Sequence, residues 1–127
     1  MTIIRFINID LDVSSEQSIR PLTEYLTYNG LSNLSKAEDR NASYELDVLF
    51  NSANAALSVM LDVLEKLPPE PHEAWQACTR REFNLGFECG TEPSAFDEPI
   101  EPDVVKRISA LGGCFRITLY SHQQNQN

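Results

Sequence analysis

The sequence predicts an α+β fold: a single mixed or antiparallel sheet of four to five strands with helices packed on one face. Each clear strand segment has one apolar and one polar face, and segments of helical periodicity separate these strands. A sheet covered on both faces would show continuous apolar strands instead. The 127 residues fit one domain, which we place at residues 1–121, followed by a polar tail at 122–127 that we expect to be disordered.

Strands are expected around residues 3–13, 43–50, 82–89 and 114–120, with a short edge strand near residues 31–34. In the first strand, the apolar face consists of Ile7, Ile9, Leu11 and Val13. The opposite face of that strand carries Asn8, Asp10 and Asp12. The final strand alternates Phe115, Ile117 and Leu119 with polar residues in the same way.

Helical patterns separate these strands. The first helix is expected soon after Ser14, because Ser14 and Gln17 resemble a capping box. The strongest helical pattern has one continuous apolar stripe, formed by Ala56, Val59, Met60, Val63, Leu64 and Leu67. A short helix near residues 71–79 and a last helix that begins at Pro102 complete the pattern.

The charge balance restricts the possible partners. Nineteen acidic and ten basic residues give a formal net charge of -9. Such a surface repels phosphate backbones and anionic membranes, so we expect neither nucleic acid nor membrane as a partner. The natural partner is a basic protein, and the alternative is that the charge serves only solubility.

Cysteine usage and hydropathy indicate a cytoplasmic protein. Cys78, Cys89 and Cys114 form no C-x-x-C motif, and we expect them to be reduced, buried and structural. The N-terminal residues do not resemble a signal peptide, and no run approaches the roughly 20 apolar residues of a membrane span.

Catalytic and cofactor motifs are missing from the sequence, so we expect no enzyme activity, no catalytic residue, no metal site and no cofactor. His72 and His122 are expected to be exposed surface residues. Asp10 and Asp12 share one strand face, as do Glu45 and Asp47, and such a pair could bridge a divalent ion. A solvated polar face is the favoured interpretation of both pairs.

The polar face of the predicted sheet is also acidic. If the strands are neighbours, it gathers six carboxylates beside one aromatic residue; the predicted partner-binding residues are Asp10, Asp12, Glu45, Asp47, Glu82, Glu88 and Tyr120. Only Arg116 clearly opposes these charges. A face of this kind favours a basic partner, because complementary charge speeds and selects encounters. The alternative is that misassigned helices or a dimer mate cover the face.

One part of the chain resembles a known group of proteins. The resemblance runs from Trp75 to Tyr120 and consists of residues 83–90 (FNLGFECG), Phe96, Ile100, Pro102, Val105, Ile108, Leu111, Gly112 and residues 117–120 (ITLY). These residues resemble small uncharacterised bacterial domains, some of which look like immunity proteins that protect a cell from toxins. The matching positions are core and turn residues, so the resemblance implies a fold and assigns no catalytic residue.

The leading hypothesis is a cytoplasmic immunity-type protein that binds and neutralises a cognate, nuclease-like toxin domain by occluding its basic active site. Tyr120 would serve as an aromatic anchor in that complex. A second hypothesis is a homodimeric structural or regulatory module without catalytic activity. A third is a small enzyme with a site at the open sheet face. The sequence leaves open whether the protein is a monomer or a homodimer.

Overall fold

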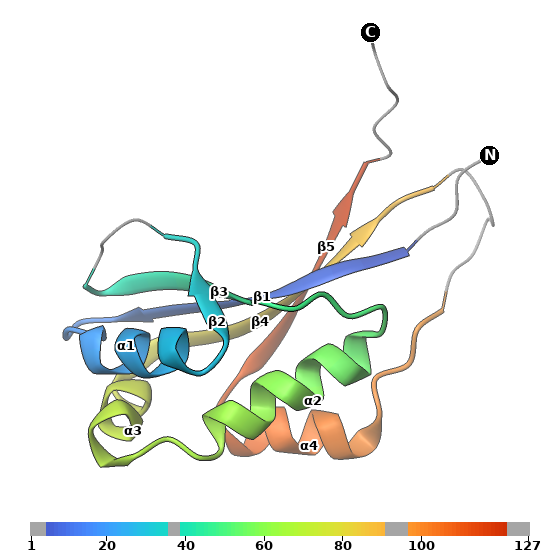
Figure 1. The fold of residues 1–127 in the computed structure, drawn as a ribbon. Coiled ribbons are helices and arrows are strands. Elements are labelled where there is room, and N and C mark those ends of the chain that lie inside the picture. The colour runs from blue at the N-terminus through green and yellow to red at the C-terminus, as the bar shows by residue number, and fades with distance from the viewer. Residues whose placement is uncertain (1–4, 36–38, 91–96, 122–127) are drawn as a thin grey trace, which may run out of the picture.

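The computed structural model describes residues 5–35, 39–90 and 97–121. Within these ranges the fold is the predicted α+β arrangement, with one mixed five-stranded sheet and four helices (Figure 1). The predicted tail at residues 122–127 lies outside the described residues.

The strands lie in the order β2-β3-β1-β4-β5. Their bounds are β1 Arg5–Ser15, β2 Leu31–Asn33, β3 Asn41–Leu46, β4 Cys78–Glu88 and β5 Cys114–Tyr120. Neighbouring strands are antiparallel except β4 and β5, which run parallel and are joined through a helix. The first strand of the chain is therefore the middle strand, and β2 and β5 form the edges of the described sheet.

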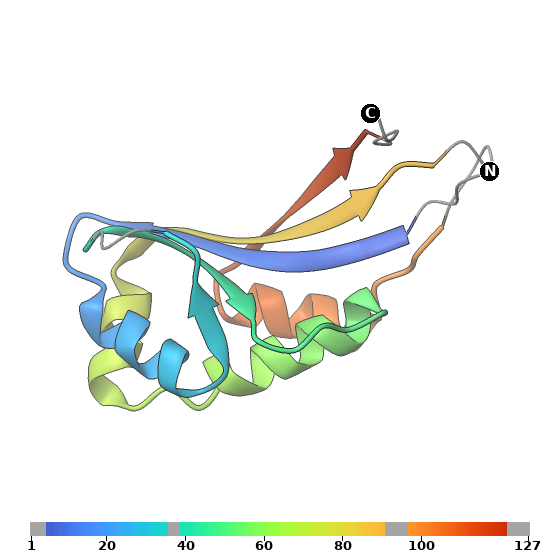
Figure 2. The same cartoon turned by 45° about the horizontal axis from the view of Figure 1, so that its top comes forward.

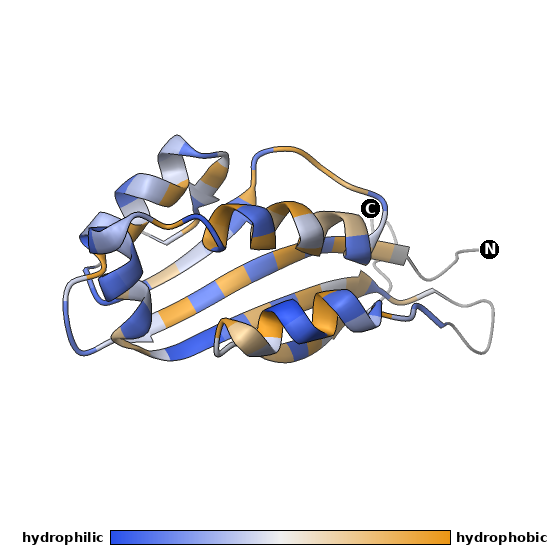
Figure 3. Cartoon of the chain, turned by 90° about the horizontal axis from the view of Figure 1, so that it is seen from below, coloured by the Kyte–Doolittle hydropathy of each residue, from blue (hydrophilic) through white to orange (hydrophobic). Residues whose placement is uncertain are grey.

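The helices are α1 Arg20–Tyr28, α2 Ala53–Leu64, α3 Pro69–Gln76 and α4 Pro102–Ala110. All of them lie on one side of the sheet, and the other face of the described sheet carries no helix (Figure 2). Figure 3 looks onto the helix side, where apolar and polar residues alternate along the strands that are visible between the helices. This one-sided cover agrees with the period-two strands of the sequence.

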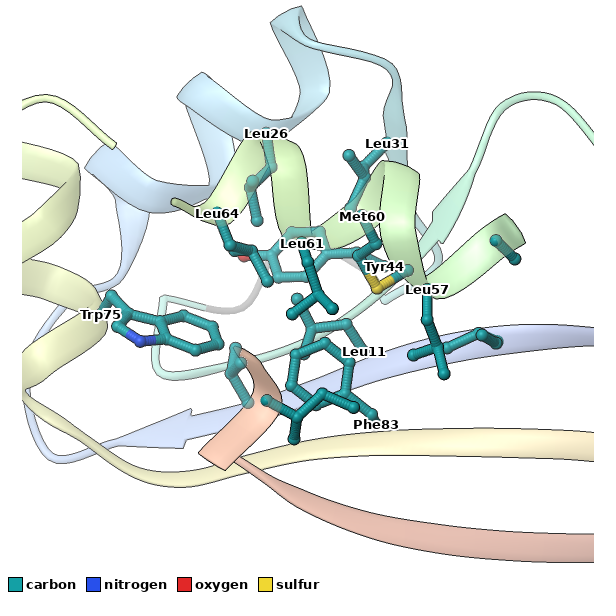
Figure 4. Close-up of a cluster of buried hydrophobic side chains, with 14 of the residues drawn as sticks. Leu11, Leu26, Leu31, Tyr44, Leu57, Met60, Leu61, Leu64, Trp75 and Phe83 are labelled. Carbon is teal, nitrogen blue, oxygen red and sulfur yellow. The ribbon is translucent and has the colours of Figure 1, made fainter. Parts of the chain in front are cut away.

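The core lies between the sheet and the helices. Leu11, Tyr44 and Phe83 project from three neighbouring strands toward α2 and α3, and each is fully buried (Figure 4). The hydroxyl groups of Tyr44 and Thr23 are 2.6 Å apart and share a hydrogen bond. Burial raises the pKa of Tyr44 to about 12. Each large apolar side chain buried here contributes roughly 1.5–3 kcal/mol to stability.

Helix α2 buries a stripe in a different phase from the predicted one. The buried residues are Ala53, Ala56, Leu57, Met60, Leu61 and Leu64. Val59, which we predicted to be inward, is 37% exposed. The helix begins at Ala53, with the Ser52 hydroxyl accepting a hydrogen bond from the Ala55 amide. Its sequence is apolar around most of its circumference, so two overlapping stripes fit the helical period and packing selects one of them.

The predicted capping box after the first strand is wrong. β1 continues through Ser15, and Ser14 pairs with Asn41 and Arg80 in the sheet. The Ser15 hydroxyl accepts a hydrogen bond from the Gln17 amide, but α1 begins only at Arg20. Pairing of β1 on both sides accounts for the difference, because ladder hydrogen bonds hold Ser14 in the extended conformation.

A register shift near the start of β1 changes which residue faces the core. Phe6 pairs with Phe87, and the next pair is Asn8 with Gly86, so Ile7 is an extra residue in β1. Phe6 packs against the core instead, and its ring lies edge-on to Phe87 with centroids 5.8 Å apart. The predicted alternation therefore holds from Ile9 onward and fails at Ile7.

Two strand boundaries also differ from the prediction. β3 ends at Leu46, and Val48 and Leu49 are 66% and 80% exposed. The three-residue neighbour β2 pairs no further than Leu46, and the backbone then turns toward α2. At the other boundary, β4 begins at Cys78, four residues before the predicted start at Glu82.

Arg81 explains why the start of β4 was missed. The side chain of Arg81 occupies an inward position of the strand, where the period-two pattern requires an apolar residue. Its guanidinium donates hydrogen bonds to the carbonyl groups of Trp75, at 2.9 Å, and Gly112, at 3.2 Å. It also lies 5.7 Å from the centre of the Trp75 ring, which donates a 3.0 Å hydrogen bond to the carbonyl of Leu111. This cluster joins α3, β4 and the turn before β5.

Candidate protein-binding face

The strand order places most of the predicted partner-binding carboxylates on one continuous face. Asp10 of β1 lies between Glu45 of β3 and Asn84 of β4. One row along, Asp12 lies between Ser43 and Glu82. These residues project from the side of the sheet that no described helix covers (Figure 2). The strands that carry these carboxylates are therefore neighbours, as the acidic-face hypothesis requires.

Glu82 is neutralised within the protein itself. Arg116 donates to both of its carboxylate oxygens, at 2.6 and 3.1 Å, and Arg80 donates at 2.8 Å. The hydrogen bonds from Arg116 and Arg80 lower the pKa of Glu82 to about 2. The side chain of Glu82 is only 10% exposed, so it contributes little surface to a partner. Its placement on the face is as predicted, whereas its surroundings make it a structural ion-pair centre.

Asp12 is partly neutralised by the same cluster. It accepts a 2.6 Å hydrogen bond from the Ser43 hydroxyl, and Arg80 lies 3.7 Å from its other oxygen. Together, Asp12 and Glu82 balance the charges of Arg80 and Arg116. The part of the face near β4 and β5 is therefore close to neutral.

Asp10 and Glu45 form an acidic pair that has no cation beside it among the described side chains. They lie directly opposite each other on β1 and β3, and neither has an ion-pair partner among the described residues. Asn8 donates a hydrogen bond to Glu45. One carboxylate oxygen of Asp10 is buried and has no hydrogen-bond partner in the described part of the chain. Burial first, and then repulsion by Glu45 and Asp12, raises the pKa of Asp10 to about 6.

Asp47 extends this acidic pair beyond the end of β3. It is exposed and accepts a hydrogen bond from the hydroxyl of Ser32, which pairs with Glu45 across β2 and β3. We call the surface formed by Asp10, Glu45 and Asp47 the acidic half-face. It lies toward β2 and β3, away from the neutral half near β5.

Glu88 and Tyr120 lie at the far end of the face. Glu88 ends β4 and pairs with Tyr120 on β5. Tyr120 is 45% exposed, and its ring lies close to Gly86, where an added Cβ would approach the ring to 3.1 Å. Both residues are therefore on the predicted face, but the paired residues Asn8 and Gly86 lie between them and Asp10.

Arg80 is a charged residue of this face that was not predicted from the sequence. Its charge falls on the open face because β4 begins at Cys78, whereas we expected the strand to begin at Glu82. The polar alternation Arg80, Glu82, Asn84 could have revealed this earlier start. The inward Arg81 concealed it.

The remaining candidate groups do not join this face into a reactive centre. Cys78 is buried, as predicted, but Cys89 is half-buried and Cys114 is exposed at the start of β5. His72 is exposed, as predicted, and His122 lies outside the described residues. Within residues 5–35, 39–90 and 97–121, no three His, Cys, Asp or Glu side chains are grouped to hold a metal ion.

One cavity in the described part of the protein has a volume of about 460 Å³. It is lined by Phe6, Ile7, Leu49, Phe50 and Asn51. None of these lining residues is ionisable, and none is a predicted partner-binding residue. The cavity therefore supplies no acid–base pair for the chemistry of an enzyme.

Comparisons with protein-family models, with curated proteins and with solved structures give no match to this chain. Of the helices in the described ranges, none combines the length and the apolar character needed to cross a membrane.

Proposed function

We propose that this chain is an acidic binding protein of the immunity type, which neutralises a toxin domain by covering its basic active site. The observation that supports this function most directly is the acidic half-face. Asp10 and Glu45 oppose each other on an uncovered sheet face with no cation beside them in the described structure. Two carboxylates in that arrangement repel each other, and a cation from a partner would remove the repulsion.

The contact surface in this proposal is narrower than the set predicted from sequence. Glu82 is occupied by Arg80 and Arg116, so the proposal moves the centre of binding to Asp10, Glu45 and Asp47. A partner Lys or Arg could donate to the opposed carboxylates of Asp10 and Glu45. Glu88 and Tyr120 remain candidates for the rim of the contact.

The proposed mechanism is occlusion without catalysis in the cytoplasm. A nuclease-like toxin binds nucleic acid through basic residues. An acidic sheet face can occupy that nucleic-acid-binding site in place of the substrate. Charge complementarity then gives fast, salt-sensitive association.

The test uses the purified product of the reading frame next to that of this chain as the binding partner. The double variant Asp10→Asn/Glu45→Gln removes the two unpaired charges with little change of shape. We expect its affinity to fall by about 10–100-fold at low salt, and by less at high salt. The matched control is Glu24→Gln/Glu73→Gln, which makes the same charge change on exposed residues of α1 and α3.

The possible outcomes separate the site from the function. Equal affinity in both double variants contradicts binding through the acidic half-face. Failure of the unaltered chain to bind that product, or to suppress its activity, contradicts the immunity-type function.

A further inference from the structure

Strand β5 presents an apolar strip that the described fold does not bury. Phe115, Ile117 and Leu119 are 38%, 64% and 64% exposed. The register of β5 with β4 puts them on the helix side of the sheet, directly beside the buried Phe83, Leu85 and Phe87. In the described part of the chain, α4 buries Val104 and Ile108 but leaves this strip uncovered. Three adjacent exposed apolar side chains are typical of an interface.

β5 is also an unprotected edge strand. It pairs only with β4 among the described strands, and its sequence CFRITLY contains no proline, no lysine and no carboxylate. The opposite edge, β2, is only three residues long. Edge strands usually carry charges, prolines or bulges that prevent pairing with another chain, and β5 has none of these except Arg116.

The backbone of β5 is oriented for pairing. The Cys89 amide donates to the carbonyl of Tyr120, so the polar backbone groups of Tyr120 point toward β4. Because successive residues of a strand point their amides to opposite sides, the amides of Phe115, Ile117 and Leu119 point to the free edge. The residues with exposed apolar side chains are thus also those whose backbone groups face no other strand in the described sheet.

We propose that β5 pairs antiparallel with β5 of a second copy of this chain, with a two-fold axis at Ile117. This register places Ile117 opposite its own copy and Phe115 opposite Leu119 of the second copy. All three outward-pointing residues then form hydrogen-bonded pairs, which gives about six interchain backbone hydrogen bonds. The apolar strips of the two copies become continuous on the helix side, and the polar residues of both strands stay on the other face.

The charge distribution favours a second copy at this edge. Each chain has a net charge of -9, so two copies repel each other over most of their surfaces. Arg116 is the only charged residue of β5, and Glu82 neutralises it. In the paired arrangement Asp10 lies five strand spacings, about 24 Å, from its copy. That distance is roughly three Debye lengths at physiological ionic strength, so the repulsion is largely screened.

A basic partner fits this edge less well than a second copy does. Cations prefer the acidic half-face near β2 and β3, at the opposite side of the sheet from β5. The dimer would leave both acidic half-faces open, one toward each end of a continuous sheet. The proposal is therefore independent of the proposed function.

Sedimentation of the full chain tests the proposal. As the concentration is raised to about 0.1 mM, we expect sedimentation of the unaltered protein to give a mass of twice the 14.3 kDa of one chain. Ile117→Lys should weaken association by at least about tenfold, because it puts a charge opposite its own copy in the apolar strip. The matched control is Val48→Lys, since Val48 is 66% exposed and the charge change is the same.

A second variant separates pairing from folding. Ile117→Pro removes an amide that points away from β4, so it costs the single chain no sheet hydrogen bond while it blocks the interchain pair. Circular dichroism shows whether each variant is folded. In the unaltered protein, hydrogen exchange at Phe115, Ile117 and Leu119 should slow as concentration rises, whereas exchange at Arg116 and Thr118 should not change.

Three results would overturn the proposal. The first is that the unaltered protein is a monomer throughout this concentration range, even if another molecule is found to cover the apolar strip of β5. The second is a dimer that folded Ile117→Lys and Ile117→Pro variants leave intact. The third is a dimer that Val48→Lys weakens as much as Ile117→Lys does.

Discussion

Asp10 and Glu45 face each other across two antiparallel strands, and the nearest guanidinium groups on the same face are bound to Glu82 and Asp12. In the described sheet, a carboxylate pair without a cation therefore lies one row away from carboxylates that bind two guanidinium groups. Asp10 and Glu82 give opposite dependences of stability on pH, because the pKa of Asp10 is raised and that of Glu82 is lowered.

Asp10→Asn should stabilise the protein at neutral and alkaline pH. The pKa of Asp10 is raised from 3.8 to about 6 in the folded protein, so the folded state binds its proton more tightly than the unfolded state does. Its contribution to stability is fully present below about pH 4 and is lost as pH rises through 6. We expect the substitution Asp10→Asn to raise the free energy of unfolding by roughly 1–2 kcal/mol more at pH 8 than at pH 4. This range allows for solvent screening of the charge.

Urea denaturation at both pH values measures this gain. Glu24→Gln is the control, because it removes one negative charge from an exposed site of α1. An equal gain in the two variants would show that net charge, and not the site of Asp10, determines the effect.

Glu82→Gln should show the reverse pH dependence. The pKa of Glu82 is lowered from 4.5 to about 2, because Arg116 and Arg80 bind its ionised form. The stabilisation is present above about pH 4.5 and is lost as pH falls through 2. We expect the variant to lose about 1–2 kcal/mol at pH 7, since two half-exposed guanidinium groups lose their shared anion. The measurement is the free energy of unfolding of the unaltered protein and of Glu82→Gln between pH 7 and pH 2. A difference between them that stays constant over this range would contradict the prediction.

Trp75→Phe should destabilise the protein by about 2–3 kcal/mol. The substitution removes the indole N–H that donates to the carbonyl of Leu111, and it leaves a smaller ring in a fully buried site. It also weakens the contact with the Arg81 guanidinium. Thermal or urea unfolding measures the loss. Tyr28→Phe, at a position that is 90% exposed, is the control and should change stability by less than about 0.5 kcal/mol.

Substitutions at the adjacent residues Gly112 and Gly113 should destabilise the protein for different reasons. A Cβ at Gly113 would approach the buried Phe83 ring to 2.6 Å, so Gly113→Ala should cost about 1–3 kcal/mol by overpacking. Gly112 has a φ of 75°, so Gly112→Ala should cost roughly 1 kcal/mol through backbone strain. Asparagine tolerates positive φ, so Gly112→Asn should recover part of that loss, whereas Gly113→Asn should recover none. Equal recovery at both positions would exclude the overpacking explanation at Gly113.

The strand faces could be predicted from the sequence because period-two alternation depends on only a few adjacent residues. Ile9, Leu11 and Val13 are buried as predicted, and Asp10 and Asp12 project from the other side. Strand order depends on contacts between distant segments, and no local pattern encodes it. The placement of Asp10 between Glu45 and Asn84 therefore became known only from the structure.

The failures of prediction have local physical causes. Arg81 disguises the start of β4, because its inward side chain is satisfied by backbone carbonyls and the Trp75 ring. The apolar face of β5 follows the expected alternation, but no described helix extends over Ile117. Alternation predicts which side chains share a face, and it cannot state how far the covering layer extends.

The central position of β1 has a consequence for synthesis of the chain. β1 leaves the ribosome before both of its neighbours in the sheet, and β4 begins only at Cys78. At a translation rate of about 5–20 residues per second, the edge of β1 that later pairs with β4 stays unpaired for roughly 3–12 s. During this interval the nascent chain exposes Ile9, Leu11 and Val13 on a strand with one open side. Chaperone contact, if the cell requires it for this protein, is therefore expected before the fourth strand has been translated.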